Sequence, residues 1–150
     1  MTNESTLEKI ARRTGRKPIS CKCQKCQDQC RHTVCLGTPE DIEKLIQAGY
    51  IDRLIKIYWG AGMIFGHLSY PILMIQAQET DDGCTFFRNG LCELHDINLK
   101  PTEGRLSHHT LKVDNWTFKK SIAWNVAKEW IDPHNAETVK RIFDAYRSHS

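Results

Sequence analysis

The sequence predicts a mainly α-helical fold with a small β-hairpin or strand element, in a compact single domain stapled by a cysteine-rich metal-binding region. Apolar residues recur at helical spacing between capping residues along much of the chain. Seven cysteines fall into two groups, a pattern typical of metal sites in proteins without disulfides. Because 150 residues is the ordinary length of one domain, we expect a single domain over 1–150, with the cysteine region at about 21–109 and a helical C-terminal segment at about 116–147.

The first expected element is a short helix that begins at Asn3 or Ser5 and continues to about Thr14, where Gly15 ends it. The segment 21–35 that follows has neither a helical nor a strand period. Such a pattern is expected where thiolates converge on a metal from tight turns. Bound metal, rather than packing, would order this segment.

The clearest helical signal lies at 39–48. Thr38 is a typical N-cap, Pro39 occupies the first helical position and Gly49 is a typical C-terminal glycine. The expected core face consists of Ile42, Leu45 and Ile46. A second short helix at 51–58 would complete a helical hairpin around Gly49.

The rest of the chain predicts one strand, one hairpin and two helices. The continuous apolar run 71–77 favours a β-strand, and Asn89-Gly90 is a strong hairpin signal. Two helices are expected at 116–131 and 135–146, with Asp132-Pro133 as the break between them.

The start of the chain favours a cytoplasmic address, because residues 1–17 carry charges throughout and contain no apolar signal-peptide core. The run 57–75 contains no Asp, Glu, Lys or Arg and is nearly long enough to span a membrane. Gly60, Gly66 and Pro71 interrupt it. We therefore expect a buried, partly extended segment rather than a membrane partner.

The cysteines are the expected metal ligands. They are Cys21, Cys23, Cys26, Cys30 and Cys35 in the first group and Cys84 and Cys92 in the second. The spacing of Cys23 and Cys26 lets a tight turn place two sulfurs on one metal, and the hairpin at Asn89-Gly90 would bring in the second group. Buried free thiols are the alternative, and they would explain Cys35 or Cys92 singly. They would not explain five cysteines together, because the residues among them, such as Lys22, Gln24 and Lys25, are polar and offer no core. Zinc is the expected cofactor, and iron or an iron–sulfur cluster is the alternative.

Several motifs together resemble the YkgJ-type zinc- or iron-chelating domain family. They are Cys23-x-x-Cys26-x-x-x-Cys30, Thr38-Pro39-Glu40-Asp41-Ile42, Cys84-Thr-Phe-Phe-Arg-Asn-Gly-Leu-Cys92-Glu-Leu-His95 and Lys100-Pro101. The resemblance covers about 21–105 and implies metal chelation, with no further activity.

Gly104 departs from this pattern, because it stands where the resembled family has a cysteine. His95, His108 and His109 are candidate replacements, and we expect His108 or His109 to complete coordination with Cys84 and Cys92. Imidazole replaces thiolate readily at zinc and less commonly in iron–sulfur clusters, so the histidines favour zinc.

The biological task of such a metal is open. A structural or regulatory zinc module, an iron–sulfur redox or sensor protein, and a zinc-stapled nucleic-acid or protein interaction module are all compatible with the residues. Nucleic-acid binding has only a short basic stretch, 12–17, and a pI of about 8.5 behind it. Metal-dependent hydrolysis would need a general base that the sequence does not identify. No catalytic motif is evident, so an enzyme is not the expectation, and the sequence specifies neither partner nor oligomeric state.

Overall fold

The computed structural model describes residues 4–18, 34–80, 83–88, 91–94, 97, 99–106 and 117–149, and its architecture is mainly helical, as predicted. The α-helices are α1 (Thr6–Thr14), α3 (Pro39–Gln47), α4 (Ala61–Ile64), α5 (Thr102–Leu106), α6 (Ile122–Ala127) and α7 (Ala136–His149). Short 3₁₀ turns are η1 (Ile51–Arg53), η2 (Phe118–Lys120), η3 (Lys128–Trp130) and η4 (Pro133–Asn135). The strands β1 (Leu54–Trp59) and β2 (Ile72–Ala77), β3 (Glu79–Thr80) and β4 (Gly83–Cys84), and β5 (Phe87–Arg88) and β6 (Leu91–Cys92) pair antiparallel, two by two.

The two predicted N-terminal helices are confirmed, and both begin at side-chain caps. The Ser5 hydroxyl accepts a hydrogen bond from the Glu8 amide before α1. Thr38 and Asp41 form a reciprocal capping box at the start of α3. Such boxes satisfy backbone donors that a helix start otherwise leaves unpaired. On the expected core face of α3, Ile42 and Leu45 are buried and Ile46 is partly buried.

The predicted helix at 51–58 is wrong. Only the turn η1 is helical there, and β1 follows it in register with β2, so that Leu54 faces Ala77 and Trp59 faces Ile72. The run Ile-Lys-Ile-Tyr-Trp is rich in β-branched and aromatic residues, which favour strands. The local sequence at 51–58 favours helix and strand about equally, and pairing with β2, the predicted strand at 71–77, selects the strand.

The outer edge of β1 is partly covered by the last helix. The Lys56 amide donates to the Tyr146 hydroxyl of α7 at 3.4 Å. An edge strand presents unpaired backbone groups to the surroundings. Tyr146 thus reaches the side of β1 that faces away from β2.

The charge-free run 57–75 is only partly buried, against expectation. It contains the end of β1, the single-turn helix α4, and β2. Ile72, Met74 and Ile75 are buried, but Ile64 is 82% exposed and Phe65 is 58% exposed. Among the residues that the structure describes, no helix combines the length and apolar character needed to cross a membrane.

The expected continuous helix at 116–131 is broken, whereas the following helix is confirmed. Ser121 has an extended backbone with ψ 146°, and its hydroxyl accepts a hydrogen bond from the Trp124 amide, so α6 starts afresh after η2. Asp132 caps the turn before α7 by accepting from the His134 amide. The apolar spacing on both sides of Ser121 predicts one continuous helix. Serine, however, favours the N-cap position, and here it starts a new helix.

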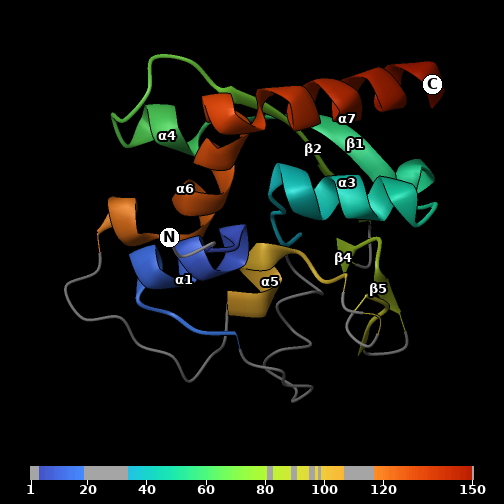
Figure 1. The fold of residues 1–150 in the computed structure, drawn as a ribbon, viewed down its shortest axis with the longest axis horizontal. Helices are drawn as coiled ribbons and strands as arrows, with labels where there is room; N and C mark the ends of the chain where they lie inside the picture. The colour runs from blue at the N-terminus through green and yellow to red at the C-terminus, as the bar shows by residue number, and fades with distance from the viewer. Residues whose placement is uncertain are drawn as a thin grey trace.

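One hydrophobic core joins these elements. Figure 1 shows α3 lying beneath α7 with the long strands β1 and β2 next to them, α1 and α5 lower down, and α6 to the left of α3, above α1. The fully buried core side chains include Ile10, Ile42, Leu45, Met74, Ile75, Phe86, Leu106, Val126 and Ile142. Helices α1, α3, α5, α6 and α7 and strand β2 therefore contribute to the same core.

A buried amide fixes the start of α3 to this core. The Gln76 side chain on β2 accepts from the Gly37 amide at 2.8 Å and donates to the Gly37 carbonyl at 2.9 Å. The Trp130 indole of η3 donates to the same carbonyl at 2.9 Å. Gln76 thus pairs with Gly37 as a neighbouring strand would, and it does so where water is excluded.

We predict that Gln76→Leu destabilises the protein by about 2–3 kcal/mol, because the buried Gly37 amide then has no acceptor. Chemical denaturation measures this change in the free energy of unfolding. Gln78→Leu is the matched control: the Gln78 amide also bonds to backbone carbonyls, but at a partly exposed position. Equal loss in both variants would contradict the role given to Gln76.

Candidate metal centre

The structure describes only part of the predicted metal centre. The predicted ligands Cys21, Cys23, Cys26, Cys30, His95, His108 and His109 lie outside the described residues. Cys35 and Cys84 are described and partly buried, and the backbone of Cys92 is placed in β6. The described cysteines are thus the last residue of the first group and both residues of the second.

Cys35 lies against α5. The sulfur of Cys35 is 3.0 Å from the position that a Cβ atom on Gly104 would occupy. The neighbouring backbone is tied to the same helix, because the Leu36 amide donates to the Glu103 carboxyl at 2.8 Å and the Glu103 amide donates to the Leu36 carbonyl at 3.1 Å. The last residue of the first cysteine group therefore touches the segment that follows the second group.

The second cysteine group is carried by short paired strands. Cys84 on β4 faces Glu79 on β3, and Cys92 on β6 faces Phe87 on β5. This pairing confirms the predicted hairpin on both sides of Asn89-Gly90, although these two residues lie outside the described ones. The Glu93 amide also donates to the Phe86 carbonyl at 2.6 Å.

Phe86 and Glu93 attach these strands to the rest of the fold. Phe86 is buried and meets the Tyr50 ring edge-on at 5.5 Å between centroids. Glu93 pairs with the Arg53 guanidinium at 2.5 Å, and this guanidinium also lies over the Phe86 ring. An apolar contact and an ion pair thus hold the backbone that carries both cysteines.

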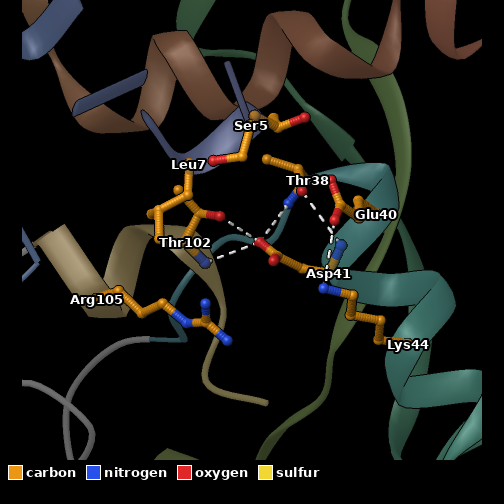
Figure 2. A pocket seen from close by; sticks show the side chains of 9 residues that line it. Ser5, Leu7, Thr38, Glu40, Asp41, Lys44, Thr102 and Arg105 are labelled. Carbon is orange, nitrogen blue, oxygen red and sulfur yellow. Dashed lines mark hydrogen bonds and ion pairs between the residues drawn. The ribbon is translucent and has the colours of Figure 1, made fainter. Parts of the chain in front are cut away.

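A shared carboxylate joins α5 to α3. One oxygen of Asp41 accepts from the Thr38 amide at 3.0 Å, from the Thr102 amide at 2.8 Å and from the Thr102 hydroxyl at 2.6 Å. Figure 2 shows this carboxylate between the two threonines, with the Arg105 side chain extending from α5 toward it. Charge-assisted hydrogen bonds of this kind are stronger than neutral ones. They fix α5, and with it Gly104, relative to the helix that follows Cys35.

The same residues line a small polar pocket where the starts of α1, α3 and α5 meet. Its volume is about 130 Å³, and its walls include Ser5, Leu7, Glu40, Lys44 and Arg105 (Figure 2). Lys44 pairs with Glu40 at 3.2 Å. Asp41, the acceptor at the centre of the pocket, accepts hydrogen bonds from Thr38 and Thr102. These bonds give Asp41 a structural role that requires no ligand.

Glu103 is poorly suited to bind a metal. Burial raises the pKa of its carboxyl, and the hydrogen bond from the Leu36 amide offsets part of that effect. A metal needs a deprotonated carboxylate with a free lone pair. Glu103 instead serves to hold Leu36, next to Cys35.

The contact between Cys35 and Gly104 is the feature that sequence reasoning missed. Within the described ranges, no three or more His, Cys, Asp or Glu side chains converge as a metal site would require. The close approach of Cys35 to a glycine 69 positions later could not be read from spacing alone. The only sequence signal was a small residue in α5 at the position where the resembled family has a ligand.

Comparison of the chain with family models, with curated proteins and with solved structures gives no match.

We predict a coupling between positions 35 and 104. A methyl group added by Gly104→Ala would lie 3.0 Å from the Cys35 sulfur and 2.8 Å from the Lys100 Cε. The flexible lysine can move away, whereas the sulfur is held by the backbone bonds at Leu36. Gly104→Ala should therefore cost about 1 kcal/mol more when residue 35 is cysteine than in a Cys35→Ala background. Denaturant unfolding of the four proteins of this cycle measures the difference, and strict additivity would refute the contact.

Proposed function

We propose that this protein binds zinc through clustered cysteine thiolates and acts as a structural or regulatory metal module. The observation that carries the proposal is the contact of Cys35 with α5, which joins the end of the first cysteine group to the segment after the second. A metal site built from two distant groups requires that their chain segments meet. The contact of Cys35 with α5 supports such an approach, because α5 follows the second cysteine group in sequence.

The chemistry of the first group supports the proposal. Five cysteines within fifteen residues, interleaved with charged and amide side chains, give thiols a polar, cationic surrounding. A cationic side chain beside a thiol favours the thiolate form that binds metal. The proposal also places the protein in the cytoplasm, where thiols stay reduced.

Ligand counting suggests two zinc ions. Two closed tetrahedral sites need about eight ligands, and the chain has seven cysteines. One histidine would then supply the remaining ligand, and His108 and His109 follow α5 closely in sequence. Cys35 would contribute its sulfur beside Gly104, near the place where the resembled family has its cysteine.

We predict that protein purified without chelators contains two equivalents of zinc, as measured by elemental analysis. Removal of the zinc should lower the melting temperature strongly. The metal centre exists only in the folded chain, so the free energy of zinc binding adds to the free energy of folding. Iron with visible charge-transfer absorbance would replace the zinc proposal by the iron–sulfur alternative. Metal-free protein that melts at the same temperature as the untreated protein would refute both.

Two variants test which residues bind the metal. We expect Cys35→Ser to lose one equivalent, and His108→Ala/His109→Ala to lose one equivalent as well, because a three-ligand site holds zinc weakly. His134→Ala is the matched control, since His134 is exposed on η4, away from both cysteine groups in sequence. Unchanged zinc stoichiometry and affinity in either variant would remove that residue or pair from the centre.

A further inference from the structure

Exposed apolar side chains concentrate in one segment of the described chain. Of the nine large hydrophobic side chains that are exposed among the described residues, seven lie between Ile55 and Leu73. We define the apolar patch as Tyr58, Met63, Ile64, Phe65, Tyr70 and Leu73. Tyr58 and Leu73 face each other across β1 and β2, and α4 supplies Met63 and Ile64. These six side chains belong to one stretch of the chain, and large exposed apolar areas on a protein surface mark sites of interaction.

A stack of aromatic rings supports the patch from beneath. Phe65 stacks on Phe118 at 4.5 Å between centroids, and His67 stacks on the same ring at 4.9 Å. His67 also meets Trp124, which stacks on Trp59 at 6.3 Å. The stack explains His67 better than the hydrogen-bonded core role that such a residue in an apolar run suggests. Because Phe65 and His67 directly follow α4, the stack fixes the end of the helix that carries Ile64.

The charged residues in the chain segments that carry the patch and its aromatic stack are all lysines. The segments 55–73 and 117–121 contain Lys56, Lys119 and Lys120 and no aspartate or glutamate. Lys119 and Lys120 directly follow Phe118, the ring that stacks on Phe65. Cations therefore stand beside an apolar, aromatic tip.

We propose that this patch binds the surface of an anionic phospholipid bilayer. Ile64, 82% exposed, and Phe65 would enter the boundary between headgroups and acyl chains. Tyr58 and Tyr70 have the amphipathic rings that favour the headgroup level. The lysines complement the negative charge of the lipids, and each basic residue near such a surface strengthens binding.

Several features favour a membrane surface over a protein partner. A single-turn helix that carries one nearly fully exposed isoleucine is a protruding tip, whereas protein interfaces are usually broader surfaces with mixed charge at the rim. Figure 1 shows α4 at one end of the molecule, well separated from α3. Insertion of α4 at the interface also differs from the spanning of a bilayer, which the glycines and proline of this run disfavour.

Vesicle co-sedimentation of the full chain tests the proposal. We expect the protein to sediment with vesicles of phosphatidylcholine and phosphatidylglycerol and less with phosphatidylcholine alone. Ile64→Ser/Phe65→Ser should weaken binding to the mixed vesicles by about tenfold or more, because the inserted apolar area is lost. Lys119→Gln/Lys120→Gln should weaken binding to the mixed vesicles only. A blue shift of tryptophan emission on binding would give a second readout, since Trp59 and Trp124 lie in the stack.

Two control variants remove exposed side chains of the same kinds outside the patch. Ile131→Ser removes an exposed isoleucine outside the patch, and Lys44→Gln/Lys140→Gln removes two exposed lysines elsewhere. The proposal is overturned if the wild-type protein stays in the supernatant with every vesicle, or if the control variants lose as much binding as the patch variants. Dimers in light scattering that Ile64→Ser/Phe65→Ser dissociates, without vesicle binding, would instead identify a protein interface and also overturn it.

Discussion

The peptide group of Gly37 is the constraint on which the rest of the fold depends. Gln76 bonds to its amide and its carbonyl, and Trp130 bonds to the same carbonyl. A side chain at this position would lie 3.1 Å from atoms of Asp41 and Ile42. Glycine lets the backbone approach α3 closely without displacing these two side chains, while it is also paired with β2 and η3. Four consecutive residues, 35–38, are thereby assigned to different neighbours: Cys35 to Gly104, Leu36 to Glu103, Gly37 to Gln76 and Trp130, and Thr38 to the α3 capping box.

This segment directly follows the first cysteine group, so its fixed position bears on metal binding. A bound metal orders a loop most effectively when one end of that loop is already held, because less chain entropy remains to be lost. The bonds at Leu36 and Gly37 hold one such end, and α5 is held by Asp41. In the proposed centre, the hydrogen-bonded frame would position Cys35, and metal would order the residues before it.

The sequence predicted those elements whose signals are local. Helix α3 was recognised from Thr38, Pro39 and Gly49, and β2 from an uninterrupted apolar run. The signal failed at β1, where the residues 51–58 suit a helix as well as a strand and only the distant partner β2 decides between them. It failed again at Ser121, which interrupts a helical pattern as a cap. For the candidate centre, the sequence predicts the residue types of the ligands, but the contact of Cys35 with α5 depends on tertiary packing that no spacing rule contains.

The hydroxyl of Tyr146 against the Lys56 amide has a consequence for aggregation. Strand β1 reads Leu-Ile-Lys-Ile-Tyr-Trp, a short sequence of high β-propensity with a single charge. A two-stranded sheet has two edges, and an uncovered edge of this composition is a template on which other chains can add as strands. Tyr146, in the last turns of α7, occupies this edge at Lys56, so loss of this end of the helix would leave the edge more open to strand pairing with other chains.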